Sequence, residues 1–234
     1  MSPIGSVGRS VRGRRLPDEA KIPESVVNRW PIDEGSGQTA ADSVGNDDLS
    51  FNFEQWQSGD WIGGWAKDFD GTDDRGDAAT TAPDGDVALY ITISFDSDID
   101  SRSYLIGFGD LTGSANDAIG IEFSGTTNEL RFAVRDGGGN FENTTHTLPT
   151  TGTYRIVGWF DDSENQIRLA VDGDQKSSAE VSDSDFSGLG TFSVGYERGP
   201  DRSFYGQILD EPMVADTSPS TEELEDDYDR QPWS

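Results

Sequence analysis

Apolar and polar residues alternate with a period of two over most of the chain from Val26 onward. The alternation is clearest over residues 89–95, 104–108, 119–123, 130–134, 167–171 and 192–196. Successive side chains of a β-strand point to opposite faces of its sheet, so this period predicts strands that each bury one face. The pattern therefore predicts a series of short β-strands.

Clusters of Gly, Asn and Asp separate these segments, as turns between antiparallel strands require. Asp172-Gly173 lies between two strand-like segments and predicts a tight hairpin turn, because glycine adopts positive φ at little cost. About a dozen short strands with turns between them favour an all-β fold, an antiparallel jelly-roll sandwich of two sheets.

One stretch, residues 218–228, has a helical pattern. Ser220 or Thr221 can cap its N-terminus, and Glu222 and Glu223 lie at the positive end of the helix dipole. We therefore expect one short C-terminal helix after the strands.

The net charge excludes several partners. The 234 residues carry 45 Asp and Glu against 17 Lys and Arg, a net charge of -28. Nucleic acid and anionic membrane surfaces are therefore unsuitable partners. No segment approaches the roughly 18 consecutive apolar residues of a membrane-spanning helix, so we also expect no membrane insertion.

The excess of acidic residues and the scarcity of lysine point to a salt-rich environment. Three of the basic residues are lysines, and the excess of acid comes with a low hydrophobic content of 32%. At about 1 M salt the Debye length is only about 3 Å, which screens repulsion among surface carboxylates. A disordered acidic chain and an ordinary acidic domain are the alternatives. The 10% aromatic content argues against disorder.

Residues 1–25 differ from the rest of the chain. Residues 1–29 hold six basic and three acidic side chains, a net of +3, whereas the remainder holds 11 basic and 42 acidic ones, a net of -31. Gly, Ser and Pro predict an extended arm. Its arginines Arg9, Arg12, Arg14 and Arg15 either belong to a solvated tail or dock onto an acidic neighbour, another copy or another protein. The arm has no apolar segment typical of a secretory signal.

The absence of cysteine removes thiol catalysis and any cysteine-ligated zinc site. The single histidine, His146, makes a Ser-His-Asp triad a remote option. The residue types therefore indicate a protein that is not an enzyme.

Five segments in order resemble the LamG-like jelly-roll domains of the concanavalin A-like lectin/glucanase superfamily. They are residues 27–46, 68–74, 153–173, 204–212 and 218–228, which include Phe69-Asp70-Gly71 and Asp210-Glu211. The resemblance covers about residues 26–229. It divides the chain into the arm (1–25), the LamG-like domain (26–217), and a short acidic helix and tail (218–234).

The resemblance also implies a calcium ion, held near the first loop and the last strand. By position its ligands would be Asp42, Asn46 and Asp210, and oxygen atoms of this kind suit calcium. The alternative is that these side chains only cap turns. Pro212 follows the Asp-Glu pair, so the last strand is expected to bulge or to end there.

Glucanases of this superfamily place paired carboxylates on one strand face, as Glu-x-Asp-x-x-Glu or Glu-x-Asp-x-Glu. Neither pattern occurs in the sequence. Asp96, Asp98 and Asp100 have the spacing but lie where the strand pattern has ended, so a turn is the better interpretation.

Three tryptophans, Trp56, Trp61 and Trp65, cluster in a Gly-rich stretch. They could stack on sugar rings, seal one end of the sandwich, or fill a subunit interface.

Two functions remain open. The first is a structural virion component of a salt-loving host's virus, a homo-oligomer docked through its arm. The alternative is a carbohydrate-binding lectin or adhesin at a cell surface or outside the cell, with a surface glycan as its partner.

Overall fold

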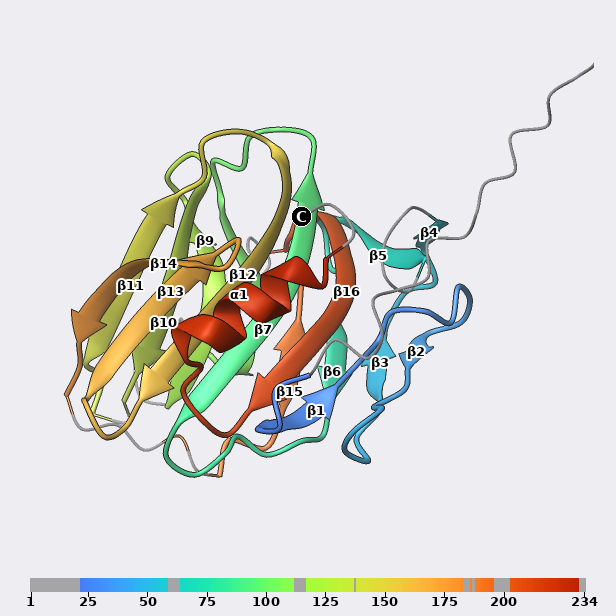
Figure 1. Cartoon of the computed structure of the whole chain (residues 1–234). Coiled ribbons are helices and arrows are strands. Elements are labelled where there is room, and N and C mark those ends of the chain that lie inside the picture. The colour runs from blue at the N-terminus through green and yellow to red at the C-terminus, as the bar shows by residue number, and fades with distance from the viewer. Residues whose placement is uncertain are drawn as a thin grey trace, which may run out of the picture.

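The computed structural model describes residues 22–58, 64–111, 117–136, 138–182, 186, 188–195 and 203–231, apart from the side chain of Asp210. Within this part of the chain, the strands form two antiparallel sheets of eight strands each, which pack as a sandwich (Figure 1). The predicted all-β, two-sheet fold is therefore confirmed.

The first sheet, the β7 sheet below, has the order β14-β13-β12-β7-β16-β5-β4, and β1 pairs with β16. Its strands are β1 (Val26–Arg29), β4 (Trp56–Ser58), β5 (Trp65–Asp70), β7 (Val87–Phe95), β12 (Gly152–Asp161), β13 (Gln166–Val171), β14 (Asp174–Glu180) and β16 (Tyr205–Ala215).

The second sheet, the β8 sheet, has the order β11-β10-β9-β8-β15-β6-β3-β2. Its strands are β2 (Thr39–Ala40), β3 (Leu49–Phe51), β6 (Gly76–Ala78), β8 (Arg102–Gly109), β9 (Ala118–Ser124), β10 (Glu129–Arg135), β11 (Phe141–Thr147) and β15 (Phe192–Val194). All six segments of clearest alternation form strands, but β15 ends at Val194, two residues earlier than expected.

The inner faces of the two sheets enclose one large hydrophobic core. Ile91 and Ile93 of β7 belong to the same cluster as Ile106 and Ile121 of the β8 sheet, and all four are fully buried. Aromatic rings add contacts across the core, as Phe95 meets Phe123 edge-on with ring centroids 5.6 Å apart. The period-two pattern supplies this core, since each strand sends every second side chain inward.

The central strands bury both faces, which corrects the expectation of one buried face per strand. Eight of the nine residues of β7 are buried. On the β7 sheet the reason is α1 (Thr221–Asp229), which lies across the outer face of that sheet (Figure 1). Its Leu224 joins Ala88, Tyr90 and Trp159 in a second apolar cluster on that face.

The helix begins as the sequence predicts. Ser220 is the N-cap: its hydroxyl accepts a hydrogen bond from the backbone N–H of Glu223 at 3.2 Å, and the Glu223 carboxylate accepts one from the Ser220 N–H at 2.8 Å. This reciprocal capping box satisfies two N–H groups that the first turn leaves free. In the described part of the chain, no helix is long and apolar enough to cross a membrane.

The Asp172-Gly173 hairpin is also confirmed. Asp172 and Gly173 have φ of 53° and 79° and join β13 to β14. Two successive residues at positive φ match the right-handed twist of the flanking strands.

The last strand bulges instead of ending at Pro212. Leu209 pairs with Thr92, whereas Met213 already pairs with Tyr90, so extra residues are inserted between the two registers. Within the bulge Glu211 has a positive φ of 46°, and its side chain is only 2% exposed.

Candidate functional site

A hollow of about 210 Å³ opens on the outer face of the β7 sheet, where β5, β7 and β16 lie side by side. Its lining includes the polar residues Asp68, Asp70, Ser94, Asp96 and Gln207 and the aromatic residues Phe69, Phe95 and Tyr205. Three strands and one turn, distant from one another in the sequence, therefore contribute to one site.

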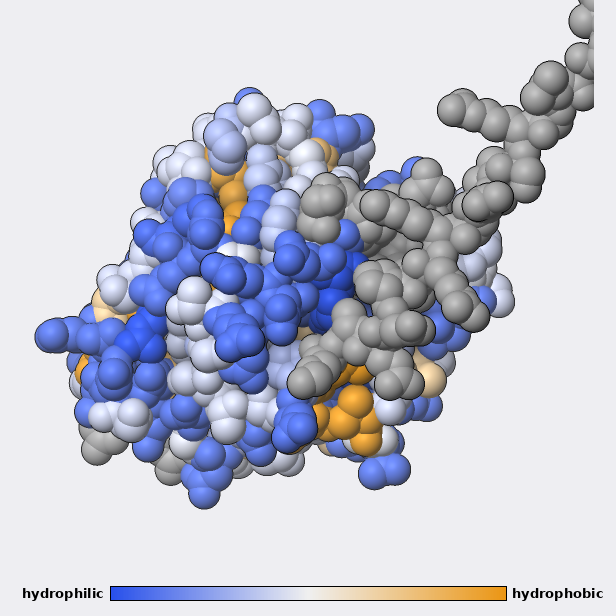
Figure 2. Space-filling model, viewed as in Figure 1, coloured by the Kyte–Doolittle hydropathy of each residue, from blue (hydrophilic) through white to orange (hydrophobic). Residues whose placement is uncertain are grey.

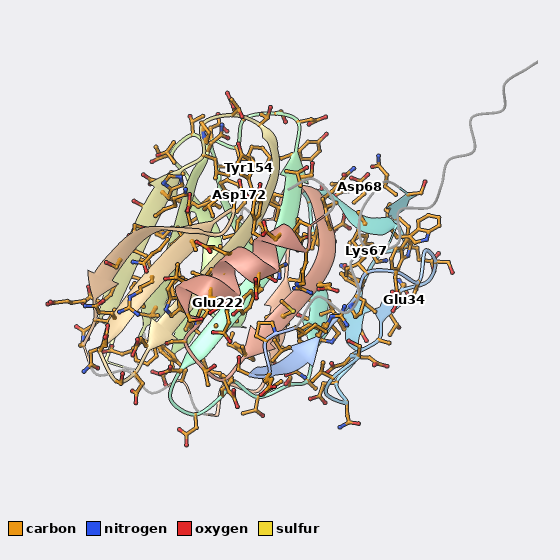
Figure 3. All side chains as sticks on the ribbon, in the orientation of Figure 1. Glu34, Lys67, Asp68, Tyr154, Asp172 and Glu222 are labelled. Atoms are coloured by element: carbon orange, nitrogen blue, oxygen red, sulfur yellow. The ribbon has the colours of Figure 1, made fainter. Side chains whose placement is uncertain are left out.

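A row of polar side chains crosses these strands. Gln207 of β16 lies opposite Asp68 of β5 on one side and opposite Ser94 of β7 on the other. Residues opposite one another in antiparallel strands share a face, about 5 Å apart. The row continues to Thr153 of β12, whose hydroxyl donates a hydrogen bond to Ser94 Oγ at 3.1 Å. Figure 3 shows Asp68 in this part of the molecule.

Tyr205 begins β16 and forms one side of the hollow, with 54% of the residue exposed. Gly71 lies behind it with a φ of +78°, and a Cβ added to Gly71 would be only 3.2 Å from Cβ of Tyr205. This close approach supports the base of the tyrosine while much of the side chain faces solvent. Among the described residues, the other exposed large hydrophobic side chain is Val44.

Burial raises the pKa of Asp68, and the neighbouring carboxyl groups of Asp96 and Asp70 raise it further. The side chain of Gln207 donates a hydrogen bond to Asp68 and opposes this rise. The hollow thus combines hydrogen-bond acceptors, an amide, a hydroxyl and an exposed aromatic ring. Such a set suits a ligand with hydroxyl groups on its edges and an apolar face.

The three predicted tryptophans differ in placement, and Trp61 lies outside the described residues. Trp56 of β4 packs against the core, and its Nε1 donates a hydrogen bond to the carbonyl of Gly37 at 2.7 Å. Trp65 of β5 packs so closely on Gly35 that a Cβ there would lie 2.4 Å from the indole. The contacts of Trp56 and Trp65 therefore resemble the sealing role that the sequence left open, and sugar binding by them stays a prediction.

The indole of Trp56 also covers a buried lysine. Lys67 is fully buried, with Nζ 4.1 Å from the ring centre of Trp56 and 4.6 and 4.9 Å from those of Phe51 and Phe53. Nζ donates hydrogen bonds to the carbonyls of Gly37 at 3.0 Å and Phe53 at 3.2 Å. Burial lowers the pKa of Lys67 to about 8. Lys67 has no exposed surface, and its ammonium group ties the backbone at Gly37 and at Phe53 to β5.

Asp42, one of the three predicted calcium ligands, has hydrogen-bond partners on both oxygens of its carboxylate. Each oxygen of Asp42 already accepts N–H groups: Oδ1 those of Arg29, Val44 and Gly45, and Oδ2 the Asn28 amide at 2.6 Å. Burial tends to raise the pKa of Asp42, but these donors outweigh it and lower the pKa. A calcium ligand needs oxygen lone pairs that are free for the ion.

The other two predicted ligands add no metal site to the described part of the chain. Asn46 is exposed in the first loop, and the side chain of Asp210 lies outside the described residues. No group of three or more His, Asp or Glu side chains within those residues is arranged to hold a metal ion. Calcium binding therefore stays a prediction, against which the geometry of Asp42 argues.

A buried ion network that the sequence did not predict lies beneath α1. Arg155 of β12 donates to both oxygens of Asp227 on α1, at 2.7 and 3.0 Å. Arg230 pairs with Asp227 and with Glu211 of the β16 bulge, and Glu211 also pairs with Arg29 of β1. Burial alone would raise the pKa of Asp227, but the two guanidinium groups outweigh it and lower that pKa. The network joins the helix to three strands.

Two signals in the sequence could have indicated these buried charges. Arg155 interrupts a mainly apolar segment of β12, and Lys67 lies between Trp65 and Phe69 on one face of β5. A charged residue in such a run implies a buried partner. The predicted arm residues Arg9, Arg12, Arg14 and Arg15 lie outside the described residues, as do residues 232–234.

Comparison with protein families gives one match. Residues 70–225 match the model of the concanavalin A-like lectin/glucanases superfamily. A search of curated protein sequences found no match.

Solved structures share the fold at low sequence identity. The binding domain of botulinum neurotoxin serotype D has a TM-score of 0.69 at 12% identity, over 88% of this chain and 50% of that one. A ligand-binding domain of the same serotype, in complex with N-acetylneuraminic acid, has a TM-score of 0.64 at 13% identity over 88% and 50%. The chain thus spans about half the length of these toxin chains.

A third structure is similar over nearly its whole length. Domain 4 of AbnA, a GH43 extracellular arabinanase from Geobacillus stearothermophilus, in complex with arabinotriose, has a TM-score of 0.66 at 16% identity. The match covers 86% of this chain and 97% of that one.

Proposed function

Because the chain belongs to the concanavalin A-like lectin/glucanase superfamily, we propose that it is a non-enzymatic carbohydrate-binding domain whose site is the hollow beside Tyr205. The observation that carries the proposal is the hollow itself. It places an exposed tyrosine next to the Asp68 carboxyl group, the Gln207 amide and the Ser94 hydroxyl on one face of the β7 sheet.

The chemistry of a sugar ring suits this lining. A pyranose ring has an apolar face of C–H groups, which packs on an aromatic ring, and an edge of hydroxyl groups, which donate and accept hydrogen bonds. Tyr205 would contact the apolar face, while Asp68 and Gln207 would bind the hydroxyl groups. A hollow of about 210 Å³ is smaller than the roughly 300 to 1,000 Å³ of drug-sized sites, so it suits a single sugar unit.

Two of the similar structures are complexes with sugars, N-acetylneuraminic acid in the toxin domain and arabinotriose in the arabinanase domain. These ligands belong to those proteins, and they support carbohydrate as the ligand class here. An extracellular or cell-surface location agrees with such a ligand.

Binding of the purified chain to a panel of immobilised glycans tests the proposal, followed by the Tyr205→Ala variant. We expect about a tenfold loss of affinity, equivalent to about 1.4 kcal/mol, because the variant removes the stacking surface. Val44→Ala is the matched control, since Val44 is 47% exposed but does not line the hollow. Unchanged binding by Tyr205→Ala, or no binding to any glycan, would refute the proposed site.

The non-enzymatic part of the proposal is supported by the carboxylates after β7. Asp96, Asp98 and Asp100 follow the end of that strand at Phe95 and lie outside any strand. Release of reducing ends from any bound glycan would overturn this part.

A virion component of a salt-loving host's virus is the second candidate. It is supported by the charge division, +3 in residues 1–29 against -31 in the rest. Deleting residues 1–25 tests it: loss of self-association or incorporation with unchanged glycan binding supports docking through the arm. If the shortened chain still assembles, the result counts against docking through the arm.

A further inference from the structure

Three carboxyl groups surround the proposed sugar site. Asp68 and Asp70 lie two residues apart on β5 and so share the outer face of the sheet, and Asp96 directly follows β7. Of the ion pairs formed within the described part of the chain, none involves these three residues. The hollow therefore concentrates negative charge beside the exposed ring of Tyr205.

The three groups act on one another. Burial raises the pKa of Asp68 first, and the charges of Asp96 and Asp70 then raise it further. A ligand that places one more negative charge in this space would meet the same repulsion, with partial burial weakening the screening by water.

We propose that the hollow binds an uncharged sugar unit and excludes sugars that carry a carboxylate, an inference that rests on the proposed carbohydrate function. The lining favours a ligand that donates hydrogen bonds. Its three carboxyl groups, on Asp68, Asp70 and Asp96, accept hydrogen bonds, whereas among the lining side chains only the Gln207 amide has N–H groups to donate. Hydroxyl groups of a neutral sugar supply such donors, whereas a sugar carboxylate only accepts. Repulsion between like charges is a direct way to reject the wrong ligand. The site then differs in ligand class from the toxin domain that forms a complex with the acidic sugar N-acetylneuraminic acid.

Matched sugar pairs test the charge selectivity. The methyl glycosides of glucose and glucuronate, of galactose and galacturonate, and of mannose and mannuronate differ only in a hydroxymethyl group or a carboxylate. Each is titrated into the full chain at pH 7 in 0.1 M KCl, with binding followed by NMR chemical shifts. We expect at least tenfold tighter binding of the neutral member of every pair that binds.

The test variant is Asp68→Asn with Asp96→Asn. Asparagine keeps an oxygen that accepts the hydrogen bond from Gln207 but removes the charge. Asp70 is left intact because its carboxylate accepts the Thr72 N–H at 2.8 Å within the following turn. We expect the preference for neutral sugars to fall below threefold, through tighter binding of the acidic member of each pair.

A second variant removes the same charge elsewhere. Asp33→Asn with Glu222→Gln alters two exposed carboxylates that do not line the hollow, and we expect it to keep the full preference. Equal loss of preference in both variants would assign the effect to the overall charge of -28 and overturn the inference.

The two proposals fail in different ways. Acidic sugars that bind as tightly as neutral ones, or more tightly, overturn the charge selectivity and leave carbohydrate binding standing. If no sugar of any pair binds and no glycan of the immobilised panel binds, the carbohydrate function itself is refuted.

Discussion

Replacing the buried carboxylate of Asp227 should detach α1 from the β7 sheet. Asp227 is 1% exposed and receives two hydrogen bonds from Arg155, itself 1% exposed, and one ion pair from Arg230. Asp227→Asn keeps the volume of the side chain but leaves two guanidinium groups beneath the helix. Arg230 keeps the Glu211 carboxylate as a partner, whereas Arg155 keeps only neutral acceptors, the Thr92 hydroxyl and the Glu211 carbonyl.

The expected cost follows from this burial. Removing one partner of a buried ion pair costs about 3 to 5 kcal/mol, because the other charge is left without compensation. Glu211 still pairs with Arg230, so we expect the lower end, about 3 kcal/mol. At roughly 2 to 4 °C per kcal/mol for a chain of this size, the Tm should fall by about 6 to 12 °C.

Thermal unfolding followed by circular dichroism measures this change at pH 7. Asp226→Asn is the control: it removes the same charge from the neighbouring, exposed position of α1 and should change the free energy of unfolding by about 0.5 kcal/mol or less. The double variant Arg155→Met with Asp227→Leu removes both charges and should recover part of the loss. If Asp227→Asn melts within 2 °C of the parent chain, the network does not hold the helix.

Three further predictions concern Lys67, salt and calcium. The pKa of Lys67 is lowered to about 8, so between pH 8 and its ordinary value of 10.5 the unfolded chain holds a proton that the folded chain has released. Lys67 should therefore add about 1.5 kcal/mol to the free energy of unfolding between pH 8 and 9.5, and urea titrations should find this rise absent in Lys67→Met. If the acidic surface is adapted to molar salt, the Tm should be higher in 3 M than in 0.1 M KCl; equal values would contradict the high-salt prediction. EDTA and added calcium at fixed ionic strength should leave the Tm unchanged, because N–H groups occupy the Asp42 oxygens, and a shift would show that calcium binds.

Local signals predicted the parts of the fold that local interactions determine. The capping box joins Ser220 and Glu223, three residues apart, and the hairpin depends on Asp172 and Gly173 alone. Strand periodicity is equally local, and it located β7, β8, β9, β10 and β13 correctly. The bulge at Pro212 followed from a missing backbone donor, which is again a property of one residue.

The buried charges and the hollow depend instead on the strand order, which periodicity does not specify. Arg155 and Asp227 are 72 residues apart and meet only because α1 folds back over β12. Tyr205 and Asp70 become neighbours only because β16 pairs with β5. Sequence reasoning left sugar stacking as one of three roles for Trp56, Trp61 and Trp65. It did not single out Tyr205, the exposed aromatic residue that lines the hollow beside hydrogen-bonding groups.

The extent of α1 explains why the hollow lies where it does. On β7 the outward side chains of Ala88 and Tyr90 are in the apolar cluster with the helix, and Thr92 accepts a hydrogen bond from Arg155 in the ion network. Ser94, one outward position or about 7 Å farther along the strand, lines the hollow instead. Where α1 covers this face, the surface in Figure 2 is mostly hydrophilic. The ion network thus fixes the helix over one part of the sheet, and no residue of the helix lines the hollow.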